Sequence, residues 1–149
     1  MPAYGTEGTT MTRRFGVTID CGHPTSLAQF WCEILGYIED PPPDGFQSWA
    51  EYDTANGVSA AEADSGCTII DPAGTLPRIY FQQVPEPKSG KNRVHLDVVA
   101  SEQHRWADVA AAADRAVELG GSVVRESDDA NDRFITLTDP EGNEFCLVL

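Results

Sequence analysis

The segment around His95 holds the residues of this sequence that are best suited to chemistry. Arg93, His95 and Asp97 occupy alternate positions, so a strand would place all three on one face. An imidazole titrates near neutral pH and can act as an acid, a base or an anchor for a ligand. Asp97 is near enough in sequence to interact with His95. A histidine that only hydrogen-bonds to its neighbours fits the same pattern, so both interpretations stay open.

Cys146 and a set of aromatic residues are further candidates. A cysteine becomes a nucleophile where a nearby cation lowers its pKa, and otherwise serves as a small buried residue. Aromatic side chains could form a wall against a flat ligand; the candidates are Trp31, Trp49, Tyr80 and Phe134. We expect Trp31 to lie in the core and Trp49 to contact the ligand.

A small basic cluster stands out in an otherwise acidic chain. It consists of Lys88, Lys91 and Arg93, and it could hold an anionic group or be a solvated linker. The sequence has no glycine-rich phosphate loop, no nucleophile elbow and no paired-histidine zinc motif. The four cysteines are far apart and form no zinc-knuckle pattern, so we expect them to be reduced.

Composition excludes several classes of protein. The chain has 149 residues and a formal net charge of −14, which argues against binding to nucleic acid or to anionic membranes and is compatible with a cationic ligand. No apolar run approaches the roughly 20 residues of a membrane span. The first 12 residues contain no apolar stretch typical of a secretion signal. We therefore expect a cytoplasmic protein.

The second half of the chain supplies the elements that would position His95. Alternating apolar residues predict a strand over 93–99, and helical spacing predicts a helix from Ser101 to Leu119. Three further strands are predicted over 122–126, 133–138 and 144–149. The predicted order is therefore β-α-β-β-β.

The first half repeats that order. A strand is predicted over 14–20 and a helix over 24–35, and both helices end in Leu-Gly. The turn that begins at Asp71 has the same Asp-Pro-x-Gly pattern as the one at Asp139, and a strand over 79–82 follows it. A shared order of elements at this spacing indicates an internal repeat.

The repeat predicts how the domain is organised. We expect a loose tail over 1–13 and one domain over 14–149, made of module one (14–85) and module two (92–149). Module one carries extra residues that we interpret as an insertion over 44–63, with a short helix over 48–56.

These motifs together resemble the vicinal-oxygen-chelate superfamily, in particular its glyoxalase-like domain group. The motifs are the Phe30-Trp31 helix that ends at Leu35-Gly36-Tyr37, the Val84-Pro-Glu-Pro-Lys88 segment before Arg93-Val-His95-Leu-Asp97, and the turn Asp139-Pro-Glu-Gly-Asn143. The resemblance implies an α+β fold, in which two βαβββ modules form a cupped, incomplete-barrel mixed sheet with helices outside. It also implies a ligand cleft on the inner face.

Alternation then predicts which side chains line that cleft. With Trp49 from the insertion, the expected cleft residues are Thr18, Trp49, Tyr80, Gln82, Arg93, His95, Asp97, Phe134 and Cys146. Within this set His95 is the candidate catalytic residue.

The resemblance also implies four metal-ligand positions, which fall here at Gly16, Gln82, His95 and Cys146. Only Gln82 and His95 retain a usual ligand type, and the carboxylate of the final strand is missing. We therefore expect no metal cofactor. If a divalent ion such as zinc, nickel, manganese or iron does bind, we expect Gln82, His95 and Cys146 to hold it.

The expected function is therefore metal-free binding of a small molecule, such as the sequestration of a drug or natural product. The alternative is a metal-dependent lyase, isomerase or dioxygenase of the same superfamily, and a purely structural interaction role is a third. A homodimer is compatible with each of these, and the fold alone does not decide among them.

Overall fold

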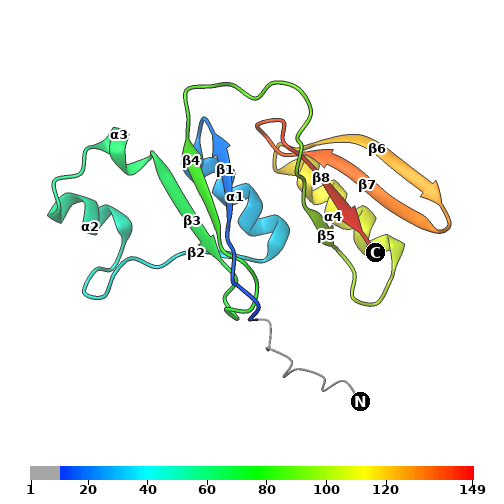
Figure 1. Cartoon of the computed structure of the whole chain (residues 1–149), viewed down its shortest axis with the longest axis horizontal. Helices are drawn as coiled ribbons and strands as arrows, with labels where there is room; N and C mark the ends of the chain where they lie inside the picture. Colours follow the sequence, from blue (N-terminus) through cyan, green and yellow to red (C-terminus); the bar gives the residue numbers. More distant parts are fainter. Residues whose placement is uncertain (1–10) are drawn as a thin grey trace, which may run out of the picture.

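The structure is a computed structural model that describes residues 11–149, and it contains two βαβββ modules (Figure 1). Module one comprises β1 (Val17–Cys21), α1 (Pro24–Leu35), β2 (Ile38–Glu39), β3 (Gly66–Ile70) and β4 (Ile79–Gln83). Module two comprises β5 (Asp97–Val99), α4 (Trp106–Glu118), β6 (Ser122–Asp129), β7 (Asp132–Thr138) and β8 (Glu144–Val148). The predicted α+β fold and internal repeat are confirmed. Most of the tail predicted over 1–13 lies outside the described residues.

Each module forms its own four-stranded sheet. The strand orders are β1-β4-β3-β2 and β5-β8-β7-β6, so both modules use the same topology. In each sheet the first and last strands of the module pair in parallel and the remaining pairs are antiparallel. The outer edges of β1 and β5 have no strand partner in the part of the chain that the structure describes.

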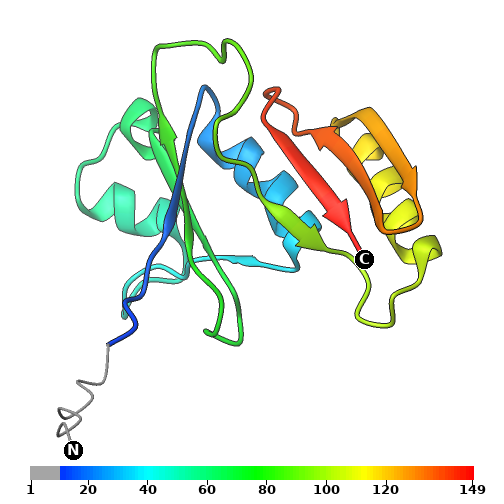
Figure 2. The same cartoon turned by 45° about the vertical axis from the view of Figure 1, so that its right-hand side comes forward.

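The insertion forms two short helices, α2 (Trp49–Ala55) and α3 (Ala60–Ala63). The helix predicted over 48–56 is confirmed, and Ser48 caps it by accepting a hydrogen bond from the Glu51 N–H. Neither helix buries a residue. Figures 1 and 2 show both helices on the side of the first sheet away from α1.

Two predicted boundaries in module two are wrong. The strand predicted over 93–99 begins only at Asp97, the first residue with a register partner on β8, although the Leu96 carbonyl already accepts a hydrogen bond from the Cys146 N–H. The helix predicted from Ser101 begins at Trp106. His104 has a φ of 53°, a left-handed conformation that a helix cannot contain. His95 therefore lies outside the strand, in the irregular segment that leads into β5.

One core joins the helix-covered sides of both sheets. Trp31 and Phe30 on α1 contact Phe145 on β8, with ring centroids 4.9 and 6.0 Å apart. The Trp31 Nε1–H also donates a hydrogen bond of 3.1 Å to Oδ2 of Asp139, which is only 2% exposed. The expected core position of Trp31 is confirmed. α1 packs on the first sheet and contacts β8 of the second sheet through Phe30 and Trp31, and Figure 2 shows it between the two sheets. In each sheet the face opposite α1 or α4 contributes no residue to this core and is called the uncovered face.

The two Asp-Pro-x-Gly turns differ in what they bind. Asp139 accepts hydrogen bonds from the Glu141 and Asn143 N–H groups as well as from Trp31. Asp71 accepts only from its own turn, from the Ala73, Thr75 and Leu76 N–H groups. These hydrogen bonds, led by that of Ala73, lower the pKa of Asp71 to about 2.

None of the helices within residues 11–149 combines the length and the apolar character that a membrane crossing requires.

We predict that Asp139→Ala destabilises the chain by about 3 kcal/mol, because it leaves the buried Trp31 N–H and two turn N–H groups without their acceptor. Chemical unfolding followed by tryptophan fluorescence measures the loss. Asp71→Ala is the matched control, since it opens the same type of turn without touching the other module. Equal losses of unfolding free energy in the two variants would show that the contact between the modules does not contribute to stability.

We predict that Asp71→Asn reduces the difference between the free energy of unfolding at neutral pH and that at acid pH. The folded-state pKa of about 2 lies below the ordinary value of 3.8, so the ionised carboxylate stabilises the fold above about pH 4 and loses this effect as pH falls toward 2. Unfolding curves at a series of pH values should show the two proteins converging near pH 2. Asp114→Asn, on the exposed side of α4, is the control. A pH-independent difference would contradict the assignment.

Candidate functional site

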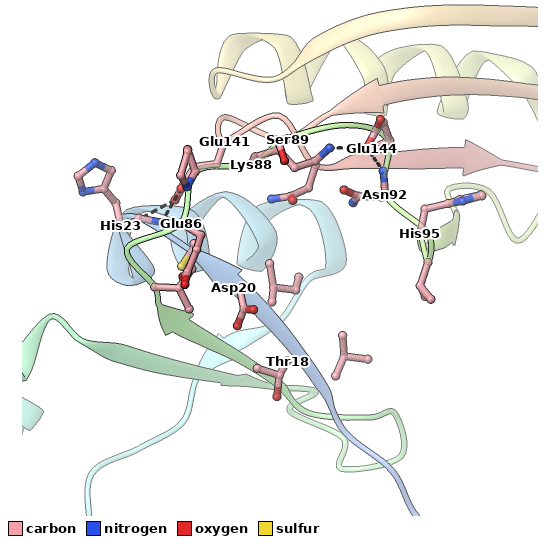
Figure 3. A pocket seen from close by; sticks show the side chains of 18 of the residues that line it. Thr18, Asp20, His23, Glu86, Lys88, Ser89, Asn92, His95, Glu141 and Glu144 are labelled. Carbon is pink, nitrogen blue, oxygen red and sulfur yellow. Dashed lines mark hydrogen bonds and ion pairs between the residues drawn. The ribbon is translucent and has the colours of Figure 1, made fainter.

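A large cavity lies between the free edge of β1 and the segment that leads into β5. Its volume is about 1060 Å³, and Thr18, Asp20, His95 and Glu144 contribute to its wall (Figure 3). The connecting segment 84–89 and the turn at 141–144 complete the lining. We call it the intermodule cavity. The contact between α1 and the Asp139 turn forms one end of it, since Trp31 and Glu141 also line it.

The intermodule cavity carries more acidic than basic side chains: Asp20, Glu86, Glu141 and Glu144 against Lys88, His23 and His95. Two of the four carboxylates have strong partners. Glu141 accepts hydrogen bonds from the Gly22 and His23 N–H groups, at 2.6 and 3.1 Å. Glu144 pairs with Lys88 at 3.3 Å, and chiefly the hydrogen bond from the Asn92 N–H lowers its pKa.

The other two carboxylates remain available. Asp20 accepts only a long hydrogen bond, 3.4 Å, from the Gln82 amide. Glu86 forms no ion pair or side-chain hydrogen bond with any residue in the described range. Figure 3 shows both side chains at the cavity. Two unpaired carboxylates favour a ligand with a positive charge.

His95 connects this cavity with a smaller one on the uncovered face of the second sheet. The smaller cavity has a volume of about 180 Å³, and its lining includes Lys91, His95, Arg125, Phe134 and Cys146. The His95 Nε2 lies 3.2 Å from Asp97 Oδ1, and the two side chains are 42% and 61% exposed. His95 can therefore exchange protons with solvent or bind a group placed in either cavity.

A row of four side chains crosses this face of the second sheet. The strand register pairs Asp97 with Cys146, Cys146 with Thr136, and Thr136 with Arg125. The Thr136 Oγ1 lies 3.4 Å from the Cys146 Sγ, and the Arg125 guanidinium lies 5.2 Å from the ring centroid of Phe134. We call this surface the second open face. Alternation predicted that Asp97, Phe134 and Cys146 share it.

The remaining predicted cleft residues lie elsewhere. Tyr80 and Gln82 are on the uncovered face of the first sheet, where the Tyr80 ring lies across Gly66; a Cβ on this glycine would be 2.3 Å from the Tyr80 Oη. The Trp49 Nε1–H donates to the Asp40 carbonyl at 2.7 Å, and its ring packs against Tyr52. Neither Trp49 nor Arg93 is among the described residues that line the two cavities.

The metal-ligand set expected from the sequence does not assemble within one chain. Gln82 belongs to β4 of the first sheet, whereas Cys146 belongs to β8 of the second sheet, and Gln82 is absent from the lining of the small cavity that holds His95 and Cys146. Gly16 offers no donor. A different set does come together: one donor atom each from His95, Asp97 and Cys146, all within 4.8 Å of one another. A nitrogen, a carboxylate and a thiol fit a three-ligand site for a divalent ion.

Two buried thiols elsewhere are chemically inert by comparison. Burial raises the pKa of Cys21 to about 11 and that of Cys67 to about 12, with smaller contributions from nearby carboxylates. Neither thiol therefore forms a thiolate near neutral pH. Cys21 lines the intermodule cavity as a protonated, weakly polar side chain.

Sequence reasoning missed several residues of the site. Arg125 follows an irregularity in the pairing of β6 with β7, between Val123 and Arg125, so simple alternation could not assign its face. Glu86 and Asn92 come from the connecting segment, whose sequence has no helix or strand periodicity from which the direction of a side chain could be predicted. Glu141 was visible as part of the repeated turn, but its bonds to the other module follow only from tertiary packing.

Comparison with known proteins places the chain in a family. Residues 16–148 match the family described as a glyoxalase-like domain. No curated protein matches the chain in sequence.

Solved structures share the fold at low identity. The fosfomycin resistance protein FosX from Mesorhizobium loti has a TM-score of 0.61 and 14% identity, with 93% of this chain and 91% of that one covered. A FosX variant from Listeria monocytogenes, complexed with Mn(II) and a dihydroxypropylphosphonic acid, has a TM-score of 0.61 and 12% identity, with coverage of 93% and 92%. A glyoxalase/bleomycin resistance protein from Albidiferax ferrireducens has a TM-score of 0.56 and 16% identity, with coverage of 89% and 95%. The family match spans nearly the whole chain, and the chain therefore belongs to the glyoxalase-like domain family.

Proposed function

We propose that this glyoxalase-like protein binds a positively charged small molecule in the intermodule cavity and sequesters it. The observation that carries the proposal is a cavity of about 1060 Å³ with two unpaired carboxylates, Asp20 and Glu86, at its wall. Its volume is comparable with that of pockets for drug-sized ligands. The net charge of −14 adds a long-range attraction for cations.

Binding without catalysis is the simpler function for this cavity. It holds His95 and several carboxylates, but Glu141 and Glu144 are already committed to structural hydrogen bonds. Sequestration requires only shape and charge complementarity, and the volume of the cavity and its two available carboxylates support this role. A glyoxalase/bleomycin resistance protein and the fosfomycin resistance protein FosX share this fold. The two antibiotics in these names, bleomycin and fosfomycin, have opposite charges and can serve as test ligands.

We predict that bleomycin, which carries positive charge, binds the chelator-treated protein more tightly than fosfomycin, which is anionic. Calorimetric titration measures both affinities. The double variant Asp20→Asn with Glu86→Gln should weaken binding of bleomycin about tenfold, because two ion pairs are lost. Added salt should weaken binding to the unmodified protein more than to the variant.

Glu126→Gln, on the exposed surface of β6, is the matched control because it removes one carboxylate far from the cavity lining. Preferential binding of fosfomycin, or a double variant that binds bleomycin as well as the parent, would contradict the proposal.

We also propose that the chain forms a homodimer. Tyr80 and Gln82 lie on the first sheet, and Phe134 and Cys146 lie on the second open face, so one chain keeps these residues on separate sheets. A second copy related by a twofold axis would place the first sheet of each chain over the second open face of the other. Exposed apolar residues on these sheets support such a contact, including Ile38 at 48% and Val99 at 62%.

We predict that sedimentation velocity detects a dimer and that Tyr80→Glu shifts it toward monomer, because a charge would be buried in the contact. Ala111→Glu, on the exposed side of α4, introduces the same charge outside the proposed contact and should leave the dimer intact. A monomer at all concentrations, or equal effects of both variants, would rule out this arrangement.

A further inference from the structure

The intermodule cavity runs along the edge of β1 and not along one of its faces. Every residue of β1, Val17–Cys21, lines it, although neighbouring side chains on a strand point to opposite faces of the sheet. The facing segment shows the same feature, since the consecutive residues 94–96 all line the cavity. Such continuous lining arises where the backbone edge of a strand borders the space. Figure 3 shows Thr18 and Asp20 along this edge.

The backbone groups on this edge of β1 have no strand partner. The Val17 N–H and the Cys21 carbonyl hydrogen-bond to backbone groups just before and just after β4. In a parallel pair, alternate residues of a strand bond to the same neighbour, so Thr18 and Asp20 direct their N–H and C=O groups to the other side. No second strand in the part of the chain that the structure describes pairs with that side.

The side chains beside this edge form a polar row and an apolar row. Thr18 and Asp20 are exposed on the uncovered face of the first sheet, and Glu86 lines the same cavity. Val17 and Ile19 pack against the core on the other face. A strand added to this edge would place every second side chain beside the carboxylates and the others beside apolar groups.

We infer that the intermodule cavity binds an extended peptide, with alternating basic and apolar residues, that adds a strand to the free edge of β1. Backbone hydrogen bonds to Thr18 and Asp20 would hold the peptide, and the carboxylates of Asp20 and Glu86 would select its charge. The inference rests on the proposed function, which assigns a positively charged ligand to this cavity, and it names the class of that ligand. A peptide of five residues matches the length of β1.

A charged side chain on an edge strand has a second interpretation. Such charges hinder pairing with another chain, and Asp20 would then serve only to keep the edge free. The surroundings of the edge favour a ligand instead, because residues 94–96 and the connecting segment 84–89 form the other walls of the cavity. A single extended chain fits between such walls more readily than the sheet edge of a second folded copy.

Calorimetric titration of the full-length protein with the blocked peptide Lys-Val-Lys-Val-Lys tests the inference. The same peptide with methyl groups on its backbone nitrogens keeps its charges and side chains but cannot donate hydrogen bonds to the edge. It should bind at least about tenfold more weakly. Amide hydrogen exchange measured by NMR should slow at Thr18 and Asp20 when the unmethylated peptide binds, because their N–H groups become hydrogen-bonded.

Thr18→Pro removes an N–H group from the free edge without removing a hydrogen bond to β4, and edge strands tolerate proline at such positions. This variant should bind the peptide about tenfold more weakly than the parent does. Thr18→Val is the matched control, since it loses the hydroxyl group but keeps the N–H, and it should bind as the parent does. Circular dichroism confirms that both variants are folded, and the methylated peptide tests the parent protein without any substitution.

The inference is overturned by absence of peptide binding, by equal binding of the methylated and unmethylated peptides, or by unchanged exchange at Thr18 and Asp20. These results leave the binding of bleomycin untouched. Conversion of a dimer into a monomer by Thr18→Pro would also overturn it, because a second copy would then occupy the edge. The proposed function fails in a different way: the double variant Asp20→Asn with Glu86→Gln would bind bleomycin as tightly as the parent does.

Discussion

The arrangement of this molecule depends on one buried hydrogen bond, from the Trp31 indole to the Asp139 carboxylate. Trp31 comes from the helix of module one and Asp139 from the last turn of module two. Burying an indole N–H or a carboxylate without a partner costs free energy. The two modules must therefore pack so that these two groups can form their hydrogen bond. The aromatic contacts of Trp31 and Phe30 with Phe145 extend the same junction.

That junction determines where ligands can bind. It draws the helix-covered sides of both sheets into one core and leaves their other faces outside. It also brings the free edge of β1 near the segment that carries His95, with Glu141 bonded to the start of α1. The intermodule cavity is the space between these two edges. The duplicated turn at Asp71 has the same local geometry but no such partner, so the two copies of one motif serve different purposes.

Much of the fold could be predicted from the sequence because the signals are local. Alternation placed Asp97, Phe134 and Cys146 on a common face, and the repeated Leu-Gly and Asp-Pro-x-Gly patterns revealed the duplication. The separation of Gln82 from Cys146 could not be predicted, because it depends on how two sheets pack through α1. The position of Arg125 on this face could not be predicted because the pairing of β6 with β7 is irregular just before it. Trp49 was expected at the ligand, yet the structure places it on α2 against Tyr52.

The central claim is that the junction between modules creates a cation-binding cavity beside His95. A crystal structure of the full-length protein grown with bleomycin tests it most directly. The expected result is ligand density in the intermodule cavity with a positively charged group against Asp20 and Glu86, and the Trp31–Asp139 hydrogen bond intact. Bleomycin bound on another surface, with the cavity free of ligand, would contradict the claim.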